Sequence, residues 1–192
     1  MDEMTAEQAV EAAKGLTFEK VWALVIQTQK MIEESQKKSE KIIADLSKNI
    51  GGLGNTLGRF TETMFSTELW KKFNEIGFPF TKQAPHMKFY MDGQVLAEVD
   101  FFLENGDYAM PVEIKTDLSI SNIDEHLERI SKIRQYMNAH DDKRKLVGAA
   151  AGGIISENVL RYAQKKGLFV IMQTGDSVAI ASMPQGVRAR EW

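Results

Sequence analysis

The stretches EVD at residues 98–100 and VEIK at residues 112–115 decide how this sequence can fold and what chemistry it can carry. Successive side chains of a strand point to opposite faces, so Glu113 and Lys115 share one face while the residue between them points into the core. If the two runs pair as neighbouring strands, Asp100 joins that face. Two carboxylates and an ammonium then meet, which is the minimum set for holding Mg²⁺ through oxygen ligands and activating a water.

The composition limits the class of protein. The 192 residues suffice for one ordinary domain and an additional element, and 43% hydrophobic residues supply a core. No cysteine is present, so disulfides, thiolate metal sites and cysteine nucleophiles are excluded, which fits a reducing cytoplasm. No apolar run approaches the roughly 20 residues of a membrane span, and the acidic first residues lack a signal-peptide pattern. We therefore expect a cytoplasmic protein that does not associate with membranes.

The charge distribution is close to neutral. The net charge is −3, with 9 acidic and 7 basic groups in residues 1–50 and 18 and 17 in the remainder. Neither region has the net positive charge expected of a protein that binds nucleic acid strongly and non-specifically. This balance counts against a protein that binds DNA tightly by itself.

A long amphipathic helix is predicted from Phe18 to about Leu57. A helix of 40 residues is roughly 60 Å long, more than one small domain can cover. We therefore expect homo-oligomerisation through this helix, and packing against its own domain is the alternative. The polar seam positions leave dimer, trimer and tetramer open. Apolar or small residues recur at alternating spacings of four and three, as in a heptad seam: Val21, Val25, Thr28, Ile32, Ser35, Ser39, Ile42, Leu46, Asn49 and Leu53.

The sequence after this helix alternates between helical and strand-like patterns. Glycines 51, 52, 54 and 58 are expected to loosen the first helix, since glycine costs up to about 1 kcal/mol per helical position. A second helix is predicted at 58–76, and strand-like runs at 87–91, 95–103 and 108–116 predict an antiparallel meander through Asp92-Gly93 and Asn105-Gly106 turns.

The remaining segments complete an α/β pattern. A helix is predicted at 121–139, with Ser121 or Asn122 as its N-cap. A strand at 146–155, rich in small residues, is expected to pack closely against neighbouring backbone. A helix at 156–166 and strands at 168–172 and 177–182 follow. This order predicts an α/β protein with a mixed sheet.

Five short segments carry a resemblance to a known family: GRFTE at 58–62, EVD at 98–100, VEIKT at 112–116, HLER at 126–129 and KGLFV at 166–170. On these segments the chain resembles the PD-(D/E)XK nuclease superfamily, and within it a prokaryotic group with an N-terminal coiled coil. The resemblance covers residues 58–192 and implies a restriction-endonuclease-like αβββαβ core there, with residues 1–57 as a helical, coiled-coil oligomerisation segment. Val99 stands where the superfamily often has proline.

The resemblance implies a Mg²⁺ or Mn²⁺ cofactor and assigns roles to four residues of the central strands. Asp100 and Glu113 would ligate the metal, and the carbonyl of Ile114 would be a third ligand. Lys115 would orient or activate the attacking water and stabilise charge on the phosphate. An ordinary ion pair on a strand face is the alternative interpretation of the lysine beside two carboxylates.

The resemblance also assigns roles to two residues outside these strands. Glu62, on the preceding helix, would be a direct ligand of the metal or support one. Gln135, on the following helix, would help to position the lysine or the substrate.

Other polar residues have two interpretations each. His126 either contacts the scissile phosphate or is a hydrogen-bonded structural residue. Arg129, Arg134 and the run KRK at 143–145 either bind phosphate or form solvated charged surfaces. His86 is interpreted as a loop residue.

The sequence therefore favours a metal-dependent nuclease presented on a coiled-coil oligomer, with nucleic acid, DNA above all, as its partner. The alternative is a catalytically silent scaffold or a nucleic-acid- or protein-binding module with the same fold. The near-neutral charge and the long helix favour that alternative. The retention of Asp100, Glu113 and Lys115 favours the nuclease, because a lysine buried beside carboxylates contributes little to stability.

Overall fold

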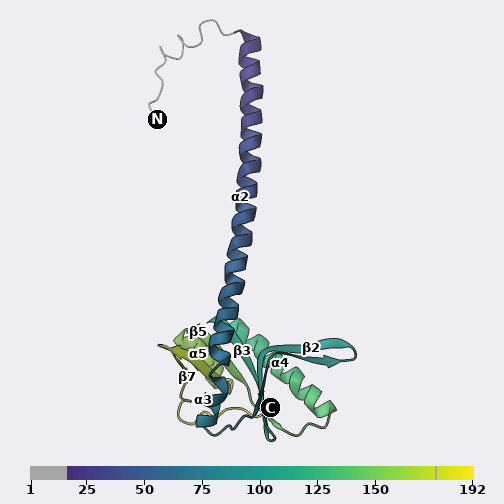
Figure 1. The fold of residues 1–192 in the computed structure, drawn as a ribbon, viewed down its shortest axis with the longest axis vertical. Coiled ribbons are helices and arrows are strands. Elements are labelled where there is room, and N and C mark those ends of the chain that lie inside the picture. Colours follow the sequence, from purple (N-terminus) through teal and green to yellow (C-terminus); the bar gives the residue numbers. More distant parts are fainter. Residues whose placement is uncertain (1–16, 176) are drawn as a thin grey trace. The chain divides into compact units, whose positions relative to one another are not determined.

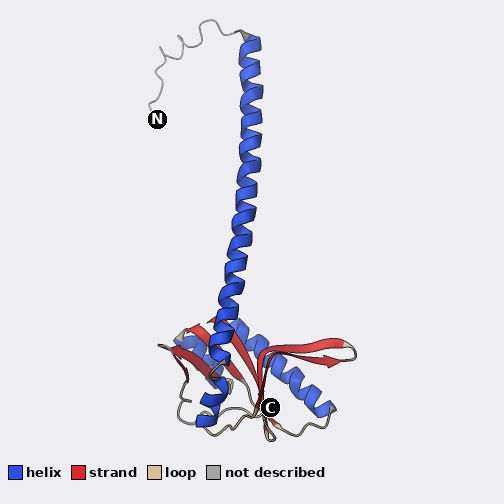
Figure 2. Cartoon of the chain, viewed as in Figure 1, coloured by secondary structure: helices blue, strands red, loops and turns tan. Residues whose placement is uncertain are grey.

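The computed structural model describes residues 17–175 and 177–192, and contacts divide the chain into two units, Met1–Leu53 and Gly54–Trp192. Of the helical segment predicted at residues 1–57, residues 1–16 lie outside the described residues. The described elements are shown in Figures 1 and 2. They are α2 (Phe18–Ser66), α3 (Leu69–Glu75), β1 (Lys82–Met91), β2 (Gln94–Glu104), β3 (Tyr108–Leu118), α4 (Ile120–Ala139), β4 (Lys145–Leu146), β5 (Ala149–Ile155), α5 (Glu157–Lys165), β6 (Phe169–Thr174) and β7 (Ser177–Ile180).

The helix end predicted near Leu57 is wrong, because α2 continues through the four glycines to Ser66. Each of the four glycines lowers the intrinsic stability of the helix through its weak helix propensity. None of them serves close packing, because a Cβ added there would meet no atom within 4 Å. The helix ends instead where the Ser66 and Thr67 hydroxyls donate to the Thr63 carbonyl at 3.1 and 2.7 Å and compete with the helical ladder. The helix predicted at 58–76 is therefore divided between the end of α2 and α3.

The second unit contains a mixed sheet of seven strands. Its order is β1-β2-β3-β5-β6-β7, with β4 paired to β3 beside β5. The strands β1, β2 and β3 form the predicted antiparallel meander, β3, β5 and β6 run parallel, and β7 closes the sheet antiparallel to β6. The α/β class with a mixed sheet is confirmed, and the strand predicted at 146–155 is two strands, β4 and β5.

Buried side chains form one cluster on each face of the sheet, because alternate residues of β3, β5 and β6 belong to different clusters. The helices α4 and α5 cover one face, and α3 with the last turn of α2 covers the other. The first cluster contains Ile123, Ile130, Ile133, Met137, Val159 and Ala163 from the helices. The second contains Phe65, Leu69 and Phe73.

The helix α4 is held at its start by a capping box. The N-cap is Ser119, so the predicted caps at Ser121 and Asn122 are wrong by two or three residues. The Ser119 amide donates to the Asn122 side chain at 3.0 Å, and the Asn122 amide donates to the Ser119 hydroxyl at 3.3 Å. This reciprocal pair fixes where α4 leaves the end of β3.

Close packing beside β5 gives a prediction for stability. A Cβ at Gly148 would lie 2.5 Å from Ile130 and 2.6 Å from Leu168, both fully buried. We expect Gly148→Ala to lower the free energy of unfolding by about 1–3 kcal/mol, because a filled core must move to accept it. Urea denaturation measures this, with Gly106→Ala as control, since no atom lies within 4 Å of a Cβ there. Equal stability of the two variants would contradict the packing.

Candidate active site

Asp100 lies where β2 separates from β3. The β2–β3 pairing runs from Phe101 opposite Val112 to Glu104 opposite Ala109. One residue before Phe101, the Asp100 carboxylate accepts a hydrogen bond from the Ile114 amide at 2.8 Å. The side chain thus takes the place of a strand partner, and beyond it the β1–β2 hairpin extends away from β3 (Figure 1).

The structure brings Asp100, Glu113 and Lys115 together. The Lys115 ammonium nitrogen lies 3.2 Å from Asp100 Oδ2 and 2.8 Å from Glu113 Oε1. The Glu113 side chain is only 4% exposed, whereas those of Asp100 and Lys115 are 21% and 37% exposed. A buried carboxylate and a more accessible one therefore meet at one ammonium on the side of the sheet covered by α4.

Two residues of α4 face the other oxygen of Glu113. Arg129 Nη2 lies 2.6 Å from Glu113 Oε2, and His126 Nδ1 lies 3.8 Å from the same atom. Sequence reasoning left both residues with open roles and did not link them to Glu113. A signal existed: His126 falls in the apolar seam of α4, at spacings of three and four from Ile123 and Ile130, where a buried histidine must face the sheet.

The environment shifts the pKa values of the central pair. Burial, and then the charge of Asp100, raise the pKa of Glu113, although Lys115 and Arg129 oppose this shift. Burial alone would lower the pKa of Lys115. The hydrogen bond to Glu113 and the charges of both carboxylates outweigh it and raise that pKa. Lys115 is therefore an ammonium at neutral pH.

His126 is a neutral imidazole. Complete burial, and then the nearby charge of Arg129, lower its pKa from 6.5 to about 3. The carbonyl groups of Pro111 and Ala149 lie near the ring and oppose this shift. Neither ring nitrogen makes a hydrogen bond of good geometry with another described group. The charge that balances Glu113 on this side is thus that of Arg129.

Glu62 lies at the edge of the site and faces another partner. The preceding residue, Thr61, contacts the Thr116 hydroxyl at 3.1 Å, next to Lys115. The Glu62 carboxylate lies 3.6 Å from His86 of β1. His86 lies opposite Asp100 of β2, because the residues before and after the two are paired across the strands. Glu62 therefore follows a residue that contacts the strand of Lys115, but its carboxylate faces His86.

The structure does not bring Gln135 to this cluster. Gln135 is exposed on α4, nine residues after His126, which is a rotation of about 180° at 3.6 residues per turn. Its side chain thus lies on the face opposite the buried His126. Ile114 does lie at the site, since its amide binds Asp100.

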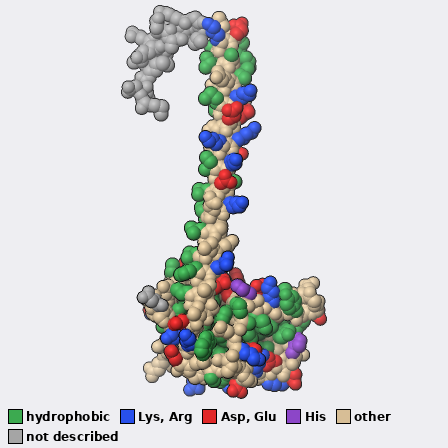
Figure 3. Space-filling model, viewed as in Figure 1, with side chains coloured by type: hydrophobic (Ala, Val, Ile, Leu, Met, Phe, Trp, Pro, Cys, Tyr) green, Lys and Arg blue, Asp and Glu red, His purple; other side chains and the backbone are tan. Residues whose placement is uncertain are grey.

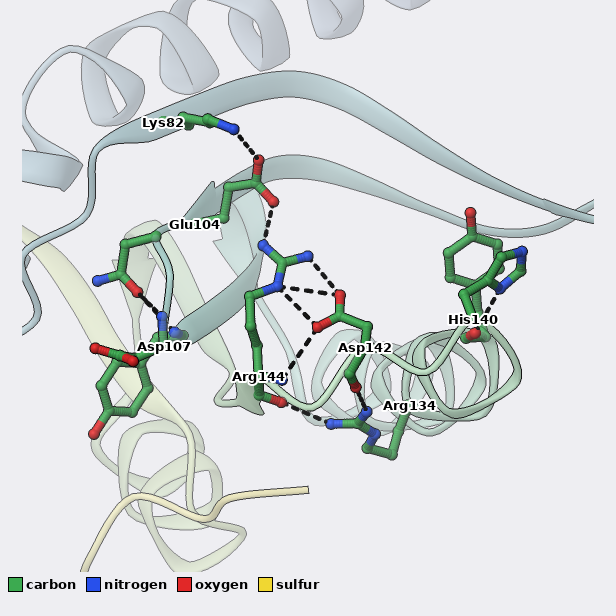
Figure 4. Close-up of polar contacts among 10 residues, drawn as sticks. Lys82, Glu104, Asp107, Arg134, His140, Asp142 and Arg144 are labelled. Carbon is green, nitrogen blue, oxygen red and sulfur yellow. Dashed lines mark hydrogen bonds and ion pairs between the residues drawn. The ribbon is translucent and has the colours of Figure 1, made fainter.

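The other basic candidates are paired with protein groups (Figure 4). Arg134 donates to the carbonyls of Arg144 and Asp142 at 2.9 and 2.6 Å and holds the loop after α4. Arg144 forms ion pairs with Glu104 and Asp142 at 2.5 and 2.6 Å, and Asp142 has a lowered pKa mainly through its hydrogen bond to Arg144.

The two lysines of the KRK run are paired as well. Lys143 lies 2.5 Å from Asp141, and Lys145 lies 3.0 Å from Glu191. Each positive charge of this run thus has an acidic neighbour, so the run does not form a free basic patch.

The donor set fits a hard divalent cation with few protein ligands. Among the described residues no group of three or more His, Cys, Asp or Glu side chains could hold a metal ion. Mg²⁺ is commonly held by one or two carboxylates, with waters and substrate phosphates completing its shell. Asp100 and Glu113 meet this requirement, because one ammonium reaches both carboxylates.

Comparison with known proteins gives little further information. No family model and no curated protein matches the sequence. Among solved structures, the small subunit of the heterodimeric restriction endonuclease R.BspD6I is similar, with a TM-score of 0.33 and 14% identity, over 62% of this chain and 72% of that chain. This degree of likeness carries no conclusion about function. Within the described part of the chain, no helix combines the length and apolarity that a membrane crossing needs.

The buried histidine gives a prediction for pH dependence. Because the pKa of His126 is about 3 in the folded protein and 6.5 in the unfolded chain, the unfolded state binds more protons between these values. This residue should therefore lower the stability as the pH falls from 6.5 to 3, with a slope of up to about 1.4 kcal/mol per pH unit. His126→Gln should flatten the dependence of unfolding free energy on pH in this range.

A control separates this effect from the general loss of stability in acid. His140→Gln, which removes an exposed imidazole at the C-cap of the same helix, is the control. Denaturant titrations at several pH values measure both. Identical slopes in the wild type and in His126→Gln would be inconsistent with a buried neutral ring.

Proposed function

We propose that residues 58–192 form a metal-dependent nuclease domain of the PD-(D/E)XK type that hydrolyses phosphodiester bonds of nucleic acid, DNA above all. The observation that carries this proposal is the convergence of Asp100, Glu113 and Lys115 at the point where two paired strands separate. The order of helices and strands around this point fits the αβββαβ core that the sequence resemblance implies. Mg²⁺ or Mn²⁺ is the cofactor that two carboxylates would hold.

The charge of each residue determines the role that we propose for it. Asp100 and Glu113, with the carbonyl of Ile114, would hold the metal, and a metal held there would supply activation of a water and polarisation of the phosphate. Lys115 stays protonated between two carboxylates, so it would orient the water and stabilise charge on the phosphate rather than remove a proton. Glu62 would support the site from its edge, and no contact of Gln135 supports a role for it there.

One observation favours the alternative of a silent scaffold or binding module. Glu113 already has a positive partner at each oxygen, Lys115 at one and Arg129 at the other. Such an arrangement is also that of a structural ion-pair network. The two functions differ in whether a divalent cation binds and whether nucleic acid is cleaved.

The nuclease proposal predicts the effect of removing the ammonium. Lys115→Ala should lower the rate of metal-dependent cleavage by about a hundredfold or more, because it removes charge stabilisation from the transition state. The measurement uses single-stranded, duplex and branched DNA and RNA, each with Mg²⁺, with Mn²⁺ or with EDTA. Lys88→Ala is the matched control, since Lys88 pairs with Glu98 at 3.5 Å on neighbouring strands at the protein surface.

The outcomes separate the two functions. Cleavage that needs metal, persists in Lys88→Ala and is lost in Lys115→Ala would support the nuclease. Cleavage unchanged in Lys115→Ala would place the activity elsewhere, and no cleavage of any substrate by the wild type would favour the scaffold.

We also propose that the N-terminal helix binds a second copy of the chain. Every described residue from 17 to 57 is exposed, and hydrophobic side chains recur along the helix (Figure 3). A seam of this kind matches itself in a second copy, as in a coiled coil. Two copies would supply the two sites that cutting both strands of a duplex requires. The exposed apolar residues include Val21, Val25, Ile32, Ile42, Leu46 and Leu53.

This association predicts an effect of charges in the seam. Ile32→Asp combined with Leu46→Asp should shift the protein to the monomer, because two carboxylates would lie in the apolar contact. Analytical ultracentrifugation measures the mass. The control is Gln27→Asp combined with Ser47→Asp, which adds the same charge outside the seam. A wild-type protein that is monomeric at micromolar concentration would refute the association.

A further inference from the structure

Arg129 has more hydrogen-bond donors than its partners use. Its Nη2 lies 2.6 Å from Glu113 Oε2, but at an angle that makes no hydrogen bond, and its Nε is buried without a hydrogen-bond partner among the described groups. Among the described residues its one other ion-pair neighbour is Glu125 at 3.9 Å, whose side chain is 63% exposed, so that contact is weak. The Arg129 side chain is itself 24% exposed. It can therefore leave Glu113 without crossing the core.

The charges at the site balance only while Arg129 remains. Asp100 and Glu113 supply two negative charges, Lys115 and Arg129 supply two positive ones, and the buried His126 is neutral. A divalent cation at the same carboxylates raises the net charge to +2. Arg129 is then repelled from Glu113, while an approaching phosphodiester and the hydroxide that attacks it each bring one negative charge.

We propose that Arg129 is an internal counter-cation of the metal site, which neutralises Glu113 in the metal-free protein and moves to a phosphate oxygen of the substrate once a divalent cation is held. This inference rests on the proposed nuclease function. Arginine suits the second position, because its planar group carries several donors that match phosphate oxygens. Arg129 thus competes with the metal and, once displaced, strengthens substrate binding.

Metal affinity gives the first test, without nucleic acid and independently of activity. Free Mn²⁺ is measured by electron paramagnetic resonance at pH 8 in the presence of each protein. Arg129→Gln should bind Mn²⁺ about tenfold more tightly than the wild type, because a competing charge is gone. Arg129→Lys, which keeps the charge, should bind like the wild type. Equal or weaker binding by Arg129→Gln would overturn the inference.

Lys132→Gln is the matched control. Lys132 is an exposed residue of α4, and its replacement removes one positive charge from the same helix. Its Mn²⁺ affinity should equal that of the wild type. If Lys132→Gln bound Mn²⁺ as tightly as Arg129→Gln, the effect would be one of net charge, and the specific role of Arg129 would be refuted. Thermal unfolding followed by circular dichroism verifies that each variant is folded.

Substrate binding gives the second test. Fluorescence anisotropy measures the affinity for a short labelled duplex oligonucleotide with Ca²⁺, which takes oxygen ligands, and without it. In the wild type Ca²⁺ should tighten oligonucleotide binding, and in Arg129→Gln most of this gain should be lost. The same gain in both proteins would overturn the movement of Arg129 to the phosphate.

Glu113→Gln separates this inference from the proposed function. If Glu113→Gln binds Mn²⁺ as well as the wild type does, Glu113 is not a metal ligand and the proposed function fails together with the inference. If Glu113→Gln loses Mn²⁺ but Arg129→Gln changes nothing, the proposed function stands and the counter-cation is refuted.

Discussion

The buried carboxylate of Glu113 is the group on which the rest of the candidate site depends. Its side chain is 4% exposed, and a charge removed from water is costly unless opposite charges surround it. Lys115 and Arg129 lie at its two oxygens, one from the same strand and one from the helix that covers this face. Removal of one partner from a buried pair typically costs about 3–5 kcal/mol. The ionisation of Glu113 therefore depends on the packing of α4 on the sheet, because this packing brings Arg129 to one oxygen of Glu113 while Lys115 lies at the other.

The separation of β2 from β3 makes room for this charged group. Regular pairing would continue past Phe101 and bring a backbone carbonyl to the Ile114 amide. The Asp100 carboxylate takes that amide instead, at 2.8 Å, so the strands part without an unsatisfied buried donor. Because the strands part at this point, Lys115 can reach both carboxylates. The Asp100 side chain thus both ends the pairing of β2 with β3 and contributes to the site.

Much of the fold and of the central site could be predicted from the sequence, because local rules determine them. Strand alternation places Glu113 and Lys115 on one face, and the two turns bring Asp100 beside them. The end of the first helix could not be placed from the sequence. The four glycines lower helix propensity too weakly to end the helix, and the hydroxyl hydrogen bonds near Ser66, where the helix does end, follow no simple sequence pattern. The partners of Glu113 were missed for a related reason. An arginine at the edge of a helical face has the same local pattern whether it contacts solvent or a buried carboxylate, and only the packing of α4 on the sheet decides between them.

Internal pairing of the basic residues has a consequence for how a nuclease of this kind would hold nucleic acid. Affinity for DNA comes largely from cations that neutralise phosphates. Here Arg144, Lys143 and Lys145 all have acidic neighbours, and Arg134 is bound to backbone carbonyls. These four residues therefore offer little free positive charge, and under the proposed function a divalent cation at the site would add to the attraction for phosphate. Under the proposed function, self-association would place two weak sites on one assembly, and the second contact would form at a high effective concentration. Under this proposal the exposed helix and the near-neutral domain would act together, because the strength of nucleic-acid binding would come from the number of sites and from the metal rather than from a basic surface.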